Sequence, residues 1–504
     1  MTAFWKDILK GSRAQRHDGW LSYDVGEAKW IRAAEALAGK TAVLLGLWGD
    51  KGAVRMALLD EATNEIAVLR LSCPDGTFPS VGRLHAPAQR LERAVHDLFG
   101  LTPVERPDAR PWLDHGRWGV RHPLGAQKRD VADGDTYDFL AAEGDGLHQI
   151  PVGPVHAGII EPGHFRFTAN GETVVRLEER LGYVHKGIEG LMAGAELGAA
   201  ARLAARTSGD STVAYSFAFA RAAEAALGME VPPRAVWLRA LMAELERLAN
   251  HLGDIGAICN DAAFAIMMAH CSVLRERVLR AADAATGHRL MRDRIVVGGV
   301  ATDLDDAGVE AIRSMLDEVG QRLPALVQLY DNTASLQDRT VATGRLNPAL
   351  ARRFGAGGFV GRASGRVFDA RRTLPYPPYD DLSFEVPLRD DGDVNARVWI
   401  RIHEVEQCLR LIRQLLDGMP EGPFRVEPKR PAGPVEGMAL VEGFRGDILV
   451  WLRLGADGRV ERCHLRDPSW FQWPLLEAVI EDNIVADFPL CNKSFNCSYS
   501  GHDL

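Results

Sequence analysis

A polar segment at residues 125–150 divides this chain into two stretches with different hydrophobic patterns. The segment is rich in Gly and Asp and offers little apolar surface to bury, so it predicts a linker between two domains. Residues 1–124 contain short apolar runs separated by turn residues, whereas residues 151–504 contain long amphipathic helical patterns. The sequence therefore predicts an α+β fold, with a small α+β domain followed by a mainly α-helical domain.

Three β-like runs lie close together in the first domain, at residues 42–48, 53–59 and 65–71. Gly, Asp and Asn residues separate them, and this spacing predicts an antiparallel meander. A helical pattern then begins at Pro87 and ends before Gly100, because proline favours helix starts and glycine favours helix ends.

Six longer stretches of the second domain have the period of an amphipathic helix. They are residues 174–195, 209–228, 232–256, 264–287, 305–331 and 394–417. Most begin at Asp, Ser or Pro and end at Gly, as the preferences of helix ends predict. We therefore expect a helical bundle with small β additions.

The composition argues against several classes of partner and location. An apolar content of 46% with 25% charged residues is typical of a globular protein with a large core. The net charge of −9 and the absence of a Lys/Arg-rich run argue against nucleic acid as a partner. No apolar run reaches the roughly 18 residues that a spanning helix needs, and no signal-peptide core is visible. We expect a cytoplasmic protein that meets a membrane only through partners.

The seven cysteines are scattered without the spacing of a disulfide framework, which fits a reducing compartment. The closest pair is Cys491 and Cys497, whose spacing differs from the two-residue gap of zinc and iron–sulfur ligands. We expect these two to be structural, and whether they interact stays open.

Ordered motifs along nearly the whole chain carry the strongest functional signal. They are residues 90–101 with 107–110, residues 153–156 with 161–166, residues 182–189, 244–251 and 298–300, residues 362–365 with Asp369 and Arg371, and residues 401–404. The first pair resembles the signature of the complex I C subunit. The others resemble, in order, the large subunit of formate hydrogenlyase-type energy-converting nickel–iron hydrogenases and the related complex I D subunit. The resemblance implies a fused C–D arrangement.

In those hydrogenases two Cys-x-x-Cys motifs hold nickel and iron, because thiolates suit soft metals. The matching positions here are Ser208 and Ser211 in the first motif, and Ser498 and Gly501 in the second. A hydroxyl is a poor ligand for a soft metal, and glycine has no side chain to offer. The resemblance therefore implies a divergent member that binds no nickel.

The resemblance implies a quinone site only in part. A tyrosine of the complex I D subunit helps to hold the quinone headgroup, and Gly209 stands at the matching position here. The histidine partner of that tyrosine has no clear match. His156 and His164 flank a Gly/Pro loop from which an imidazole could face the cavity, although a hydrogen bond to the backbone is an equal alternative.

Ionisable residues near the former metal motif are further cavity candidates. Arg206 and Asp210 belong to this motif, and an acid beside serines could hold a proton, a water or a hard cation. The alternative, which we favour, is that Ser208 and Asp210 cap the helix that follows.

Carboxylates on predicted helices could relay protons if burial raises their pKa, or could simply face solvent. They are Glu189, Glu244 and Glu246. An ion-pair network lining the cavity floor is also expected. Its members are Arg362, Asp369 and Arg371.

The resemblance as a whole implies a peripheral-arm subunit of a membrane-bound oxidoreductase. Its role would be to couple electron transfer to ion translocation on the inner face of the cell membrane, here without nickel–iron hydrogenase activity. The implied partners are an iron–sulfur small subunit, which carries the cluster, and antiporter-like membrane subunits. No cofactor is expected to bind directly, and quinone is the candidate acceptor. The alternatives are an active hydrogenase with an unusual ligand set and a non-catalytic structural subunit.

Overall fold

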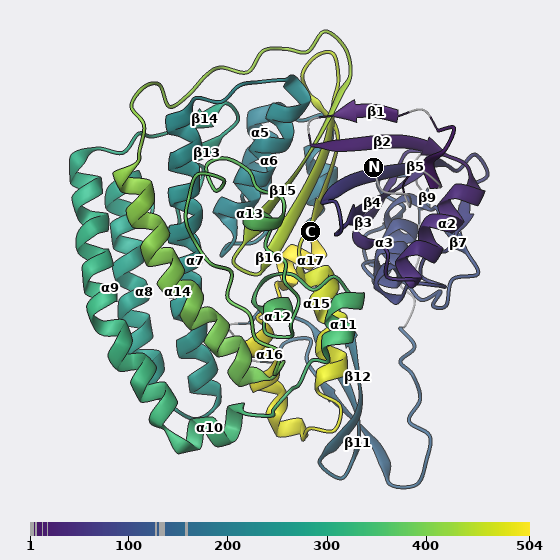
Figure 1. The fold of residues 1–504 in the computed structure, drawn as a ribbon. Coiled ribbons are helices and arrows are strands. Elements are labelled where there is room, and N and C mark those ends of the chain that lie inside the picture. Colours follow the sequence, from purple (N-terminus) through teal and green to yellow (C-terminus); the bar gives the residue numbers. More distant parts are fainter. Residues whose placement is uncertain are drawn as a thin grey trace.

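The computed structural model describes residues 5, 8–12, 14–17, 19–125, 129–130, 137–156 and 160–504. Figure 1 shows a small N-terminal module, in purple, packed against one side of a larger body that contains long helices. The predicted α+β fold is confirmed. Within the described residues, no helix combines the length and the apolar character needed to cross a bilayer.

The N-terminal module is built on a five-stranded sheet in the order β1-β2-β5-β4-β3. Its strands are β1 (Ala14–His17), β2 (Trp20–Val25), β3 (Val43–Asp50), β4 (Ala53–Asp60) and β5 (Glu65–Ser72). The last three pair antiparallel, so the predicted meander is confirmed. Strand β2 pairs parallel with β5, and helix α2 (Glu27–Ala38) follows β2.

The predicted helix of this module is present as a short turn, η1 (Ala86–Ala88), followed by α3 (Gln89–Phe99). Gly100 ends it with φ +72°, a conformation that glycine adopts without steric cost. Leu91, Val95 and Leu98 are buried on this helix, which packs against β3. Short strands β6 (Thr77–Pro79) and β7 (Thr102–Val104) flank it.

Part of the predicted linker lies outside the described residues, namely 126–128 and 131–136. Strands β8 (Val120–Arg121) and β9 (Arg129–Asp130) pair at its start, and β10 (Leu147–Val152) begins before its predicted end. The position of the domain boundary stays a prediction.

The predicted helix at residues 174–195 is wrong. Strand β12 (Thr173–Arg180) occupies its first half and pairs with β11 (His164–Asn170), which also pairs with β10. Three β-branched residues at 173–175 favour the extended backbone, and the partner strand supplies the hydrogen bonds. Helix begins only at α4 (Ile188–Met192).

The other five predicted helices are confirmed within a few residues. They are α6 (Thr212–Leu227), α7 (Pro233–Asp261), α8 (Ala265–Thr286), α9 (Asp306–Asn332) and α14 (Val394–Asp417). Helix α7 packs against both α8 and α14, and Figure 1 shows α8, α9 and α14 side by side. Asp305 and Asp393 cap α9 and α14 by accepting from backbone N–H groups.

A three-stranded antiparallel sheet joins the helices to the N-terminal module. Its strands are β15 (Val435–Gly443), β16 (Gly446–Leu454) and β17 (Val460–Arg466), and the chain then continues through α15 (Ser469–Val479), η2 (Val485–Asp487), α16 (Phe488–Phe495) and α17 (Tyr499–Asp503). Helix α6 packs on β15 and β16, whereas β17 contacts both α4 and β3.

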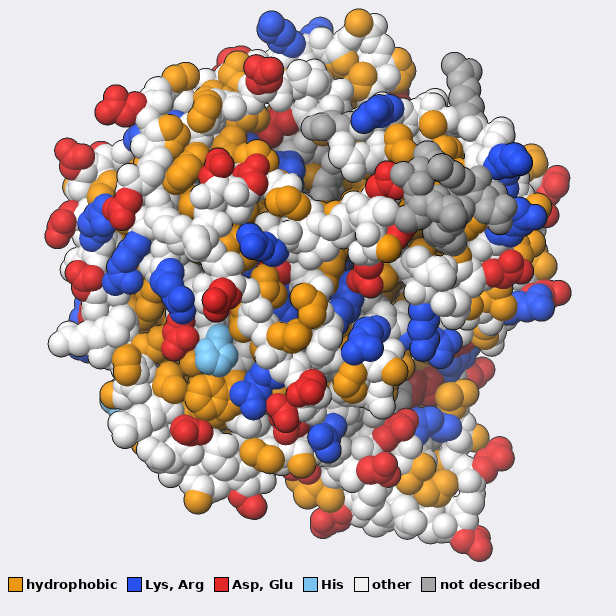
Figure 2. All heavy atoms as spheres, in the orientation of Figure 1, with side chains coloured by type: hydrophobic (Ala, Val, Ile, Leu, Met, Phe, Trp, Pro, Cys, Tyr) orange, Lys and Arg blue, Asp and Glu red, His pale blue; other side chains and the backbone are white. Residues whose placement is uncertain are grey.

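Short elements complete the larger body. They are α5 (Leu197–Ala204), β13 (Ile295–Val296), β14 (Gly299–Val300), α10 (Ala334–Thr340), α11 (Pro348–Arg353), α12 (Gly358–Arg362) and α13 (Ala370–Thr373). On the face shown in Figure 2, basic and acidic side chains are interspersed over these and the longer helices.

Candidate functional site

The structure brings the two motifs that match the hydrogenase metal ligands into contact. Ser208 precedes α6, and Ser498 stands directly before α17 at the far end of the chain. Their Oγ atoms are 2.9 Å apart, and both side chains are buried. Two hydroxyls therefore share a hydrogen bond where the resemblance places two metal ligands.

Arg445, which the sequence motifs do not include, pairs with the acid of the first motif. Its guanidinium donates from Nη1 to Asp210 Oδ1 at 2.7 Å and to Ser211 Oγ at 3.2 Å. Ser208 donates to the same Asp210 oxygen at 2.8 Å. Burial alone would raise the pKa of Asp210, but the charge of Arg445 lowers this pKa to about 2. Asp210 is thus an ionised partner of Arg445.

The predicted capping role of Ser208 and Asp210 is wrong, because Glu246 takes it instead. The carboxyl group of Glu246, on α7, accepts from the backbone N–H groups of Val213 at 2.7 Å and Ala214 at 3.0 Å. These are among the first N–H groups of α6, which have no partner within the helix. Burial raises the pKa of Glu246 to about 8. A distant helix therefore supplies the cap.

Asp467 occupies the space beside the fourth matching position. A Cβ added at Gly501 would lie inside contact distance of Asp467 Oδ2 and 2.8 Å from Ser498 Oγ. Tyr215 donates its hydroxyl to the same carboxylate at 2.6 Å. Ser498 accepts from the Gly501 N–H at 2.9 Å and so caps α17.

The residues present at this site do not fit a nickel–iron centre. The donor set is hydroxyl and carboxylate oxygen rather than thiolate, and these oxygens are already paired with one another, with Arg445 and with Tyr215. In the described part of the chain, no three His, Cys, Asp or Glu side chains are grouped so that they could hold a metal ion.

The two candidate histidines both bond to the backbone. His156 Nδ1 is 3.1 Å from the Pro154 carbonyl oxygen, and its ring centroid is 6.4 Å from that of Tyr499 in α17. His164 Nδ1 is 3.2 Å from the Gly153 carbonyl oxygen. The backbone alternative thus describes both, and His156 is the one close to the former metal motif.

Arg206 does not face the site. Its side chain is exposed and pairs with Asp293, with Nη2 2.7 Å from Oδ2. It also donates to the Arg202 carbonyl oxygen, so it fixes a surface turn.

The predicted ion-pair network exists, but it lies in the interior and does not line the cavity between the two modules that is described below. Arg362 pairs with Glu404, and Arg371 pairs with Asp369 at 2.7 Å and with Glu244 at 2.9 Å. Each of these side chains is at most 2% exposed. The network joins α7, α13 and α14 to the surrounding core.

All seven cysteines are buried and free within the described residues. Burial raises the pKa of Cys491 to about 12, so the thiol is protonated near neutral pH.

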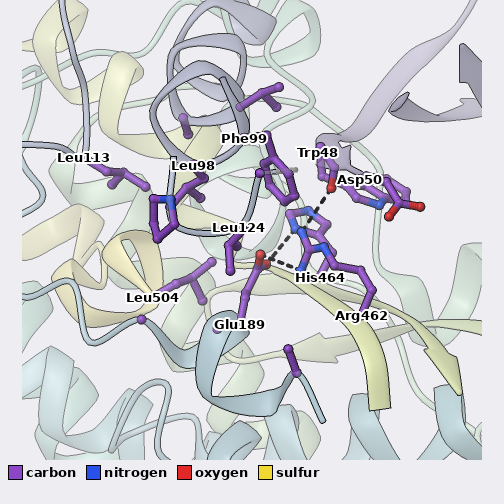
Figure 3. A pocket seen from close by; sticks show the side chains of 18 of the residues that line it. Trp48, Asp50, Leu98, Phe99, Leu113, Leu124, Glu189, Arg462, His464 and Leu504 are labelled. Atoms are coloured by element: carbon purple, nitrogen blue, oxygen red, sulfur yellow. Dashed lines mark hydrogen bonds and ion pairs between the residues drawn. The ribbon is translucent and has the colours of Figure 1, made fainter. Parts of the chain in front are cut away.

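A cavity of about 1050 Å³ lies between the N-terminal module and the larger body. Figure 3 shows that apolar and polar side chains both line it, with Trp48 and Phe99 on the same side as His464. Leu98, Leu113, Leu124 and Leu504 lie on one side, and Asp50, Glu189, Arg462 and His464 on the other. Of the candidate residues from the sequence, only Glu189 lines it.

Glu189 is held at this cavity by residues of β17. It accepts from His464 Nδ1 and Arg462 Nη1, both at 2.8 Å, and from the Leu465 N–H at 3.0 Å. Burial would raise the pKa of Glu189, but the charge of Arg462 and the hydrogen bond of His464 bring it to about 2. Burial lowers the pKa of His464, so Arg462 is the cation that keeps Glu189 ionised near pH 7.

Sequence reasoning missed His464 and Arg462. The available signal was the alternation along residues 462–466, where positions 462, 464 and 466 are polar and the intervening Cys463 and Leu465 are apolar. Such a strand presents a polar face that needs a partner.

Comparisons with known proteins agree with this architecture. A family model described as respiratory-chain NADH dehydrogenase, 30 Kd subunit, matches residues 24–129, and one described as the 49 Kd subunit matches residues 261–437. Formate hydrogenlyase subunit 5 of Escherichia coli (strain K12) is 33% identical over 442 residues, which cover 84% of this chain and 77% of that protein. The chain belongs to the family of hydrogenase large subunits and their complex I relatives. The resemblance seen in the sequence is thereby confirmed.

Other members of this family match the same arrangement. The C/D subunit of NADH-quinone oxidoreductase from Phocaeicola vulgatus is 28% identical, and the match covers 87% of this chain and 90% of that one. A chain of the membrane-bound sulfane sulfur reductase, an archaeal respiratory membrane complex, superimposes with a TM-score of 0.68. That chain is 26% identical, and the match covers 71% of this chain and 99% of that one. The C-like and D-like parts therefore follow one another in one chain.

Proposed function

We propose that the protein is the peripheral-arm subunit of a membrane-bound oxidoreductase and that it has no nickel–iron hydrogenase activity. The observation that carries the proposal is the hydrogen bond between Ser208 and Ser498 at the positions of metal ligands. Two further contacts support the proposal: Asp467 lies against the Gly501 position, and Arg445 pairs with Asp210, so the polar groups there already have partners.

In this role the chain takes part in coupling electron transfer to ion translocation. Its expected partners are an iron–sulfur small subunit and antiporter-like membrane subunits at the inner face of the membrane. Quinone is the proposed acceptor, delivered through the assembled complex. Membership of the family and the near-complete overlap with a chain of an archaeal respiratory membrane complex support this assignment.

The test is a metal and protein analysis of the native complex, purified through this chain from solubilised membranes. We expect iron without nickel, an iron–sulfur protein and membrane subunits, and no exchange between hydrogen and deuterated water. Stoichiometric nickel would refute the proposal, and so would recovery of the chain as a stable monomer.

A second candidate function is structural. The chain would link the redox part of the complex to its ion-translocating part, and the former metal motif would take no part in turnover. This function is favoured by the fact that the side chains at the former metal motif satisfy one another. Asp210→Asn and His156→Gln distinguish the two functions in the assembled complex, with the exposed Arg206→Gln as the matched control. Large losses of turnover for the first two alone would support a working cavity, whereas unchanged turnover would support the structural role.

A further inference from the structure

A surface groove of the N-terminal module lies away from the rest of the chain. It has a volume of about 420 Å³, and all of its lining residues fall between positions 27 and 105, on α2, β6, the turn after β6 and the end of β7. Figure 1 places α2 and β7 on the side of the module that faces away from the larger body. Contacts with that body come from other elements, such as β3 in the stack of Trp48 on His464. The larger body therefore leaves this groove uncovered.

Exposed apolar side chains of the module converge on the groove. Among the described residues up to position 124, three large apolar side chains are exposed, and all three line it. They are Ile31 of α2, which is 40% exposed, Leu84 between β6 and η1, which is 37% exposed, and Val104 at the end of β7, which is 48% exposed. Single exposed apolar residues are normal on a protein surface, but a group from three separate elements around one hollow is the pattern of an interaction site.

The walls of the groove are fixed by contacts within the module. Trp30 of α2 donates from Nε1 to the Pro79 carbonyl oxygen at 3.0 Å, which ties the helix to β6. Its buried ring also packs edge to face on that of Phe78, with centroids 6.3 Å apart. Strand β6 pairs with β7, and the Ser80 N–H donates to the Val104 carbonyl oxygen at 3.2 Å. A groove that is formed in advance lowers the ordering cost of binding.

The charges of α2 are divided between the groove and the rest of the helix surface. The helix carries two acids, Glu27 and Glu35, and two bases, Lys29 and Arg32. Both acids are exposed and line the groove, whereas neither base does. Lys29 instead donates to Ser12 Oγ at 2.7 Å, outside the groove. The groove side of α2 is therefore acidic.

The opposite wall does not compensate this charge. Arg83 and Glu105 also line the groove and pair with each other. Three acids and one base thus surround the groove, so two negative charges remain, and Glu27 and Glu35 have no ion pair among the described side chains. A partner that carries Lys or Arg beside its apolar side chains would match both the charge and the apolar character of this surface.

We propose that this groove binds an amphipathic helix of a partner protein. The apolar stripe of that helix lies between Ile31, Leu84 and Val104, and Lys or Arg side chains along its edges face Glu27 and Glu35. A helix suits the groove because one apolar stripe can contact both walls while polar residues on either side stay in water. The groove shares no residue with the former metal motif, so the proposal holds or fails independently of the nickel analysis.

The first test measures the binding of two synthetic helical peptides to the full-length chain by fluorescence anisotropy. Both peptides carry leucines at positions i, i+3, i+4 and i+7, and lysines flank this stripe in one peptide and glutamates in the other. We expect the lysine peptide to bind about tenfold more tightly, because two exposed charge pairs together contribute about that factor. The preference should fall at high salt, which screens such pairs.

Matched variants assign the binding to the groove. The double variant Glu27→Lys, Glu35→Lys should reverse the preference between the peptides, whereas Glu310→Lys, at an exposed position of α9, should keep it. The double variant Ile31→Ser, Val104→Ser should weaken both peptides about tenfold or more. Ile266→Ser, on α8, is the control, since its side chain is 50% exposed and lies outside the groove.

The second test uses the native complex, with the photoreactive residue p-benzoylphenylalanine in place of Val104. We expect a cross-link to a helix of a co-purified protein whose sequence has an apolar stripe flanked by Lys or Arg. A cross-link to a second copy of this chain, or no cross-link at all, would overturn the proposal. Equal affinity for the two peptides would also overturn it, and so would unchanged binding by Ile31→Ser, Val104→Ser.

Discussion

Ser208 and Ser498 are 290 positions apart in the chain, yet their hydroxyl oxygens are 2.9 Å apart in the core. Thiolates at these two positions would be able to share a metal between them. The hydroxyls share a hydrogen bond instead, and the side chains around them pack against this bonded pair. Asp210, Arg445 and Asp467 surround the pair with hydrogen bonds and ion pairs.

Gly501→Ala should destabilise the protein by about 1–3 kcal/mol, the usual cost of overfilling a packed site. The added methyl group would collide with Asp467 and with the Ser498 hydroxyl. Urea unfolding followed by tryptophan fluorescence measures the change. Gly209→Ala is the matched control, since its added Cβ meets nothing within 4 Å. Equal stabilities of the two variants would contradict the close packing of Gly501 on Asp467.

Arg362→Met should lower the free energy of unfolding by about 3–5 kcal/mol, because it leaves buried anions without their cation. Arg362 is fully buried and pairs with Glu404 and Glu442. Arg313→Met removes an exposed pair with Asp417 and should cost less than about 1 kcal/mol. Chemical denaturation of both variants measures the two losses in free energy of unfolding. Similar losses would show that the interior ion pairs are well solvated.

Glu189→Gln should cost about 3 kcal/mol at pH 7 and progressively less in acid. The folded pKa of Glu189 is about 2, below the value of 4.5 for a free carboxyl. Its stabilising effect is therefore complete above pH 4.5 and is lost as the pH falls toward 2. The free energies of unfolding of wild type and variant should approach each other as the pH is lowered from 7 to 3. A constant gap over this range would show that the charge of Glu189 is not what stabilises the β17 contact.

Glu246→Gln should show the opposite pH dependence. Burial raises the folded pKa of Glu246 to about 8, so the folded protein keeps a proton that the unfolded chain loses above pH 4.5. This contribution to stability is present below pH 4.5 and is lost as the pH rises toward 8, by roughly 1.4 kcal/mol per unit. The amide variant keeps an uncharged group at this position. Its free energy of unfolding should therefore rise relative to that of the wild type over that pH range. Parallel stability profiles would mean that Glu246 stays ionised while capping α6.

The sequence predicted elements whose pattern is local. The apolar runs of residues 42–71 are separated by turn signals, and helices α6, α7, α8, α9 and α14 have long apolar periods, so both appeared where expected. Strand β12 was missed because its apolar positions fit either a helix or a strand, and pairing with β11 decides between them. That pairing is a tertiary effect which overrides local propensity.

The site was predictable only where a residue belongs to a recognised motif. Ser208, Ser498 and Glu189 were found in this way. Arg445, Asp467 and His464 were not found, because each bonds to a residue more than 200 positions away in the chain, namely Asp210, Tyr215 and Glu189. The fold brings such distant residues into contact, and no local spacing in the sequence predicts these contacts.

Arg445 touches three groups from two distant segments: the Asp210 carboxylate and the neighbouring Ser211 hydroxyl, and the Asn496 carbonyl oxygen. In evolutionary terms this makes the former metal motif hard to restore. A cysteine placed at 208, 211 or 501 meets a carboxylate or a guanidinium that already bonds there, so each of these single changes is expected to lower stability before any metal binds. The order of substitutions therefore matters. A lineage with this core would have to replace Arg445 and Asp467 before new thiolates could be of use.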